Sequence, residues 1–81
     1  MKPDGENEYK TKDLPEVAAL IMQKQAPIKM QRDGDTCWFV FLHNKKTEEV
    51  SLDYYFGNLL VNAREYYEVL RMLKGKVQPR R

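Results

Sequence analysis

The segment Ile28–Leu42, IKMQRDGDTCWFVFL, decides the fold, because two apolar runs flank the dipeptide Asp33-Gly34. An Asp-Gly pair between strand-forming runs predicts a β-hairpin with a two-residue type I′ turn, in which both central residues have positive φ. The turn also sets the register of the two strands. The predicted cross-strand pairs are Arg32 with Asp35, Met30 with Cys37, and Ile28 with Phe39.

The two faces of this hairpin differ in polarity, because successive side chains of a strand point to opposite sides of the sheet. The face that we expect in the core carries Ile28, Met30, Cys37, Phe39 and Phe41. The other face carries Lys29, Gln31, Trp38 and Val40. It is less polar than a solvated sheet face, which makes it a candidate contact surface.

Three helices are predicted beside the hairpin, and the first has the clearest start. Asp13 can cap the free backbone N–H groups, Pro15 suits the first turn, and Glu16 completes a capping box. Apolar residues then recur at helical spacing. The helix ends before Pro27, because the residue before a proline is biased away from helical geometry.

The other two helices follow the hairpin. The second is predicted to begin with Thr47 as its cap and to run to about Phe56, where Gly57 ends it. The third opens with a capping box at Asn62–Glu65 and ends near Gly75.

These elements predict a single small α+β domain, a β-hairpin packed by three helices, in the order β-α-β-β-α-(β)-α. Tyr9–Thr11 and Leu59–Val61 are candidate strands that extend the hairpin to three or four antiparallel strands. The domain covers residues 9–75, between a flexible acidic arm at 1–8 and a basic tail at 76–81.

The chain has 81 residues and a formal net charge of +2, and this charge resides at the two ends. Residues 1–8 sum to −2, residues 74–81 sum to +4, and the nine basic and nine acidic side chains of residues 9–73 cancel. A neutral body is a poor electrostatic footprint for duplex nucleic acid, because affinity scales with the number of phosphates neutralised.

Composition also predicts where the chain resides. No apolar run approaches the ~18 residues of a membrane helix, and Asp4, Glu6 and Glu8 occupy positions where a signal peptide needs an apolar core. Cys37 is the single cysteine, which excludes an internal disulfide framework and favours a reducing compartment. We therefore expect a cytoplasmic protein that has no membrane partner.

Enzyme, metal and cofactor chemistry find little support in the sequence. Cys37 and His43 are the only soft metal ligands, too few for a tetrahedral site. Asp33 and Asp35 resemble the start of a calcium loop but lack its later ligands, and Ser51, the only serine, has no glycine-rich elbow. The glycines are too scattered for a phosphate-binding loop. We expect no enzyme and no catalytic, metal-binding or cofactor-binding residue.

Binding of single-stranded nucleic acid is the secondary expectation. Lys29 lies opposite Trp38 in the predicted register, and an exposed aromatic ring beside a cation can stack an unpaired base. The alternative is that a helix or a second subunit covers Trp38, with Lys29 over its ring in a cation–π contact. The candidate phosphate contacts are Lys10, Lys12, Lys74, Lys76, Arg80 and Arg81.

Binding to another protein, or to a second copy of the chain, is the main expectation. A folded core of about 65 residues buries only about 60% of its unfolded surface, so association is a common remedy. The tyrosines at 54–55 and 66–67 cannot both face inward, because adjacent helical residues point about 100° apart. The alternative is that their rings line the core edge while the hydroxyls reach water. The candidate partner-binding residues are Lys29, Trp38, Tyr55 and Tyr67.

Four motifs carry a family resemblance: YKTKDL at 9–14, RDGDTCWFVF at 32–41, LLVNAREY at 59–66 and LRMLK at 70–74. Together they resemble a family of short bacterial and phage-associated proteins that is catalogued only as a domain of unknown function. The similarity covers nearly the whole chain between the arms. The resemblance implies a small intracellular domain and supplies no activity.

Overall fold

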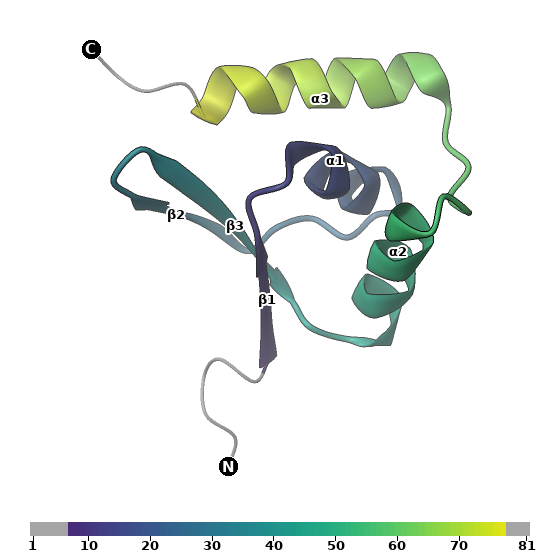
Figure 1. Cartoon of the computed structure of the whole chain (residues 1–81), viewed down its shortest axis with the longest axis horizontal. Helices are drawn as coiled ribbons and strands as arrows, with labels where there is room; N and C mark the ends of the chain where they lie inside the picture. The colour runs from purple at the N-terminus through teal and green to yellow at the C-terminus, as the bar shows by residue number, and fades with distance from the viewer. Residues whose placement is uncertain (1–6, 78–81) are drawn as a thin grey trace.

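The computed structural model describes residues 7–77, which form three helices and one three-stranded sheet (Figure 1). The predicted α+β class, the hairpin and the three helices are confirmed. Residues 1–6 of the predicted arm and 78–81 of the predicted tail lie outside the described residues. In chain order the elements are β1 (Glu8–Thr11), α1 (Leu14–Met22), β2 (Lys29–Asp33), β3 (Thr36–Leu42), α2 (Lys45–Tyr55) and α3 (Ala63–Val77).

β3 is the central strand of an antiparallel sheet in the order β1-β3-β2. The candidate strand Tyr9–Thr11 is confirmed as part of β1, which pairs Thr11 with Phe39. The candidate strand Leu59–Val61 is absent, because this segment connects α2 to α3 and Leu59 packs against the hydrophobic core. The sheet therefore has three strands, and its two edges are β1 and β2.

The hairpin turn is displaced by one residue from the predicted one. Asp33 pairs with Thr36, so the two central residues are Gly34, with φ +63°, and Asp35. Among the non-glycine residues described, only Lys24 has a positive φ, so Asp35 lacks the conformation that a type I′ turn requires. Glycine with positive φ at the first central position is typical of the type II′ turn instead.

The displaced turn corrects every predicted cross-strand pair without changing the faces. Met30 pairs with Phe39 and Arg32 pairs with Cys37, each two residues further along β3 than predicted. Ile28, predicted to lie opposite Phe39, precedes β2. Because side chains alternate with a period of two, a two-residue shift returns each β3 side chain to its predicted side of the sheet.

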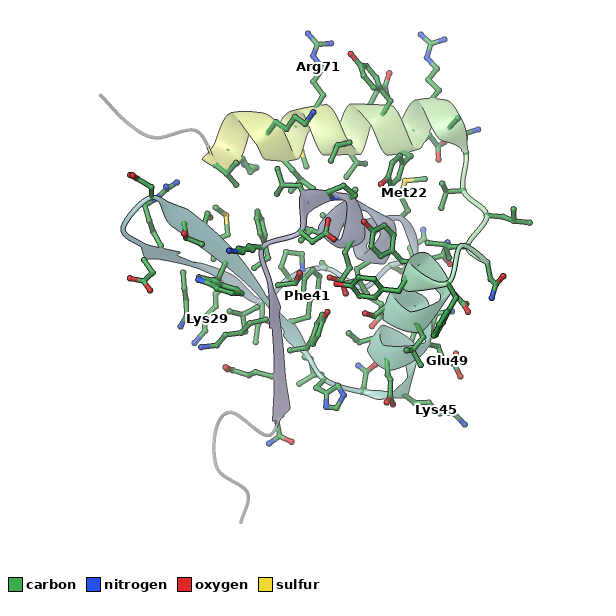
Figure 2. All side chains as sticks on the ribbon, in the orientation of Figure 1. Met22, Lys29, Phe41, Lys45, Glu49 and Arg71 are labelled. Carbon is green, nitrogen blue, oxygen red and sulfur yellow. The ribbon has the colours of Figure 1, made fainter. Side chains whose placement is uncertain are left out.

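α1 lies at the centre of the hydrophobic core. Its consecutive side chains Val17–Leu20 are fully buried, as expected for a helix that is covered on more than one side. Figure 2 shows Phe41 directed into this core. The predicted burial of the Cys37 thiol is also confirmed. The other members of the core cluster are Cys37 and Phe39 of β3, Val50 of α2 and Leu73 of α3.

The start of α1 uses the predicted cap but not the predicted capping box. The Asp13 side chain accepts a hydrogen bond from the Glu16 backbone N–H (3.4 Å). The backbone N–H of Asp13 donates to Thr11 Oγ1 (3.1 Å), which takes the place that a capping box gives to the Glu16 carboxylate. Glu16 is thereby available for other contacts, which are described below.

The boundaries of α2 and α3 also differ from the prediction. Asn44 rather than Thr47 caps α2, because Asn44 Oδ1 accepts a hydrogen bond from the Thr47 N–H (2.8 Å). α3 continues through Gly75 to Val77. Val77 packs against the core, which favours two more helical residues after the glycine.

Candidate functional site

The sheet face opposite the core, called the outer face below, combines polar and apolar side chains. The three helices pack on the core face, around Phe39 and Phe41. The prediction that Lys29, Gln31, Trp38 and Val40 share the face opposite the core is confirmed by the strand pairing. By strand alternation the outer face carries Glu8, Lys10, Lys29, Gln31, Asp33, Thr36, Trp38, Val40 and Leu42.

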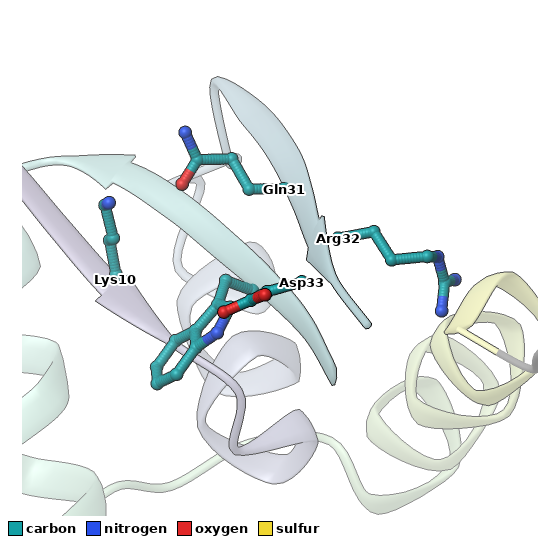
Figure 3. A pocket seen from close by; sticks show the side chains of 5 residues that line it. Lys10, Gln31, Arg32 and Asp33 are labelled. Carbon is teal, nitrogen blue, oxygen red and sulfur yellow. The ribbon is translucent and has the colours of Figure 1, made fainter. Parts of the chain in front are cut away.

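A hollow of about 590 Å³ opens on this face, lined by Lys10, Gln31, Arg32, Asp33 and Trp38. All five come from the sheet, with Lys10 on β1, Trp38 on β3 and the remainder on β2. Figure 3 shows Lys10 and Gln31 on opposite sides of the hollow, while Arg32 points towards the end of α3. There the Arg32 guanidinium donates a long hydrogen bond (3.5 Å) to the carbonyl of Val77.

Trp38 is half-buried and carries a cation over its ring. The Lys12 ammonium nitrogen lies 5.6 Å from the ring centroid, within the range of a cation–π contact. The predicted cation was Lys29, and this prediction is wrong. In the observed register Gln31 lies opposite Trp38, and Lys29 lies opposite Val40.

Lys29 instead binds across the sheet to β1. Its Nζ lies 3.8 Å from Glu8 Oε2 on the outer face. Both side chains are partly exposed, so this ion pair contributes little to stability. The outer face therefore carries three lysines near Trp38, one of which is paired with an acid.

The remaining predicted site residues do not join Trp38. Tyr55 lies on α2 with 58% of its surface exposed, and Tyr67 lies on α3 with 62% exposed. Lys74 and Lys76 are exposed in the last turn of α3, which packs on the core face. The tail residues Arg80 and Arg81 lie outside the described residues.

A buried carboxylate, missed in the sequence, joins three elements on the core side. Glu16 is fully buried in the first turn of α1. Its Oε1 accepts hydrogen bonds from Thr11 Oγ1 (2.7 Å) and the Tyr55 hydroxyl (3.3 Å). Its Oε2 accepts hydrogen bonds from Ser51 Oγ (2.5 Å) and the Tyr9 hydroxyl. Glu16 thereby links β1, α1 and α2.

The tyrosine hydroxyls around these carboxylates are held in their protonated form. Burial and the hydrogen bond to Glu16 raise the pKa of Tyr9, and the Glu16 charge raises the pKa of Tyr55. The hydroxyl of Tyr54 lies 3.2 Å from Asp13 Oδ2, and burial together with the Asp13 charge raises the pKa of Tyr54 to about 12. These groups therefore act as hydrogen-bond donors at neutral pH.

The Glu16 cluster is a closed network with a structural role. Every buried side-chain nitrogen and oxygen of the non-exposed residues within 7–77 has a hydrogen-bond partner. The four hydroxyl donors use both carboxylate oxygens. A satisfied buried network of this kind fixes how elements pack. Two sequence signals point to it: Tyr9 and Thr11 share a strand face, and Ser51 and Tyr55 share a helix face.

Two other kinds of feature are absent from residues 7–77. Between residues 7 and 77, no group of three or more His, Cys, Asp or Glu side chains has the arrangement to hold a metal ion. None of the helices there combines the length and the apolar character needed to cross a bilayer.

These features define a small α+β domain, with helices on one face of a three-stranded antiparallel sheet and an open, tryptophan-bearing hollow on the other. The chain belongs to the family described as Domain of unknown function (DUF5659), whose model matches residues 6–78. The predicted family resemblance is therefore confirmed. No curated protein and no solved structure matches the chain.

Proposed function

We propose that this domain is a cytoplasmic binding module without catalytic activity, and that the outer face around Trp38 contacts another protein. The observation that carries the proposal is the hollow: Trp38 lines an open concave surface on the sheet face opposite the helices. Tryptophan in a partly enclosed pocket is a typical anchor of protein interfaces. We also propose, from the family resemblance, that the protein is of bacterial or phage origin.

The chemistry of the hollow fits a protein partner. Gln31 and Asp33 offer hydrogen-bonding groups beside the Trp38 ring, while Lys10 supplies positive charge. An aromatic centre with a polar, charged surround is the usual composition of a non-obligate interface. The small size of the domain supports association further, because a core of this length buries little surface.

Site-specific photo-crosslinking in cells tests this proposal. A photo-reactive amino acid is placed at Lys10, which lines the hollow, or at Arg71, an exposed cation that points away from α3 (Figure 2). We expect a protein adduct from position 10, its loss in the Trp38→Ala variant, and no such adduct from position 71. Equal adducts from both positions, or an adduct that is indifferent to Trp38→Ala, would contradict the proposal.

Single-stranded nucleic acid is a second candidate partner, favoured by the lysines around the ring. Lys12 lies over Trp38, Lys10 lines the same hollow, and Lys29 projects from the same face. Cations around an exposed ring are typical of surfaces that stack bases and contact phosphates. Against this candidate, Glu8 and Asp33 lie on the same face and reduce its positive charge.

The fluorescence of Trp38, the only tryptophan, tests this second candidate directly. Titration with oligothymidylate should quench the emission, because the ring stacks on bases. Three phosphate contacts give a salt slope of about −2, so affinity should fall about 20-fold between 50 and 200 mM salt. An absence of quenching at 50 mM salt would exclude the nucleic-acid candidate.

A further inference from the structure

The edge of β2 that faces away from β3 has no strand partner among residues 7–77. The hydrogen-bond pattern of the sheet shows which backbone groups of β2 point towards β3 and which point away from it. Beyond β3, His43 N–H donates to the Asn7 carbonyl (2.8 Å), which extends the β1–β3 register by one pair. In an antiparallel ladder, hydrogen-bonded pairs alternate with pairs that are not bonded. The odd-numbered residues of β3 therefore direct their backbone groups to β1, and the even-numbered residues direct theirs to β2.

The same alternation fixes which groups of β2 point outward. Lys29, Gln31 and Asp33 pair with even-numbered residues of β3, so their backbone groups are used within the sheet. The hydrogen bond from the Ile28 N–H to the Val40 carbonyl (2.7 Å) supports this assignment, because it shows that the Val40 carbonyl is directed towards the β2 side of the sheet. The backbone groups of Met30 and Arg32 consequently point away from the sheet, at its open edge.

We propose that β2 pairs with β2 of a second copy of this chain, antiparallel, about a twofold axis at Gln31. In this register Met30 lies opposite Arg32 of the other copy, and the twofold axis generates a second, identical pair. These are the residues with outward backbone groups, so each pair can exchange both of its N–H···O bonds. The proposal deepens the binding function above, because it names a second copy as one partner of the same sheet.

The side-chain charges select the same register independently. Pairing about Gln31 places Lys29 of each copy opposite Asp33 of the other. Both side chains are exposed and both lie on the outer face, so the two pairs join opposite charges across the junction. A lysine usually protects a strand edge from association with other strands. Here each lysine, which also contacts Glu8 of its own chain, meets an aspartate of the other copy, and the edge becomes complementary to itself.

Apolar surface at the edge favours the same occupant. Met30 is 43% exposed, and Ile28, just before the strand, is 55% exposed. A second copy along β2 would bring further side chains against Met30 and reduce that exposure. It would also place the two hollows beside each other, because Gln31, Arg32 and Asp33 line the hollow from β2.

Charge reversal on the full chain tests the proposal, with sedimentation equilibrium as the measurement. Lys29→Asp brings two aspartates together at each junction, and Asp33→Lys brings two lysines together. Each variant should raise the dimer dissociation constant about tenfold or more, since two attractive pairs become repulsive. An equimolar mixture of both variants should restore association, because every junction then pairs opposite charges again.

The mixture also controls for folding, since a misfolded variant would not recover by mixing. A wild-type chain that stays monomeric up to millimolar concentration would overturn the proposal, as would a dimer that is indifferent to both reversals. Trp38→Ala separates this inference from the protein-binding proposal. It should abolish the crosslink from position 10. It should change the dissociation constant of the β2-mediated dimer by less than about twofold, since Trp38 lies on β3.

Discussion

Removal of the Glu16 carboxylate should destabilise the domain far more than removal of a comparable exposed carboxylate. Glu16→Ala leaves the hydroxyls of Tyr9, Thr11 and Ser51 without their common acceptor. Thr11 is buried and the other two are half-buried, so water reaches them poorly. Buried donors without a partner carry the full cost of their desolvation.

The size of the effect follows from these contacts. A hydrogen bond to a charged group contributes about 1.5–3 kcal/mol. Tyr55 is an exposed residue, so its hydroxyl can regain water once its contact is lost. We expect Glu16→Ala to lower the free energy of unfolding by about 3–5 kcal/mol. A domain of this length has a total stability of about 4–12 kcal/mol, so the variant should be close to unfolding.

Urea denaturation followed by Trp38 fluorescence measures this loss, and Glu48→Ala is the matched control. Glu48 also lies in the first turn of its helix, but it is exposed. Both variants lose an acidic side chain from the first turn of a helix, so their difference reflects the burial and the hydrogen bonds of Glu16. Glu48→Ala should change the stability by less than about 0.5 kcal/mol. If Glu16→Ala lies within about 1 kcal/mol of this control, the assigned role of the cluster is wrong.

Two other predictions concern the tyrosine network and the hairpin turn. Because the pKa of Tyr54 is raised to about 12, the stability from its protonated hydroxyl is complete below the ordinary value of 10.0 and is lost as the pH rises towards 12. The alkaline decrease in unfolding free energy should be shallower in Tyr54→Phe; equal slopes would count against the Asp13 contact. Gly34→Ala should cost about 1 kcal/mol, because alanine resists positive φ. Gly75→Ala is the contrasting variant, because Gly75 lies within α3 and has open space around it. It should raise the melting temperature. If both variants raise the melting temperature, the turn assignment is wrong.

The hairpin illustrates which parts of a fold local sequence patterns determine. The alternation of side chains assigned the strand residues to the correct faces, since each face depends only on whether a position is odd or even. The expected burial of Ile28 and Met30 was wrong, because Ile28 precedes the edge strand β2 and both side chains are exposed. The register was wrong because Asp33-Gly34 and Gly34-Asp35 are both acceptable turn centres, and the choice depends on the conformation of the glycine. A two-residue shift of this kind leaves no trace in the hydrophobic pattern.

The candidate site was predicted only in part, because its contacts join distant segments. Trp38 was identified from the hairpin alone, but Lys12 reaches its ring from the segment after β1. Glu16 was assigned to a capping box, since the local rule accounts for it without any tertiary contact. Its burial depends on Ser51 and Tyr55 of α2, which pack against α1 only in the folded chain. Local propensity has no information on such contacts.

Access to Trp38 tests the central claim, that the outer face is an open contact surface. Acrylamide quenching of the single tryptophan reports on this access in the isolated chain and after photo-crosslinking from position 10. We expect acrylamide to quench Trp38 clearly in the isolated, monomeric chain, though less than in the urea-unfolded chain. Quenching should decrease markedly in the crosslinked complex. Quenching that is absent from the isolated chain, or unchanged in the complex, would contradict this claim.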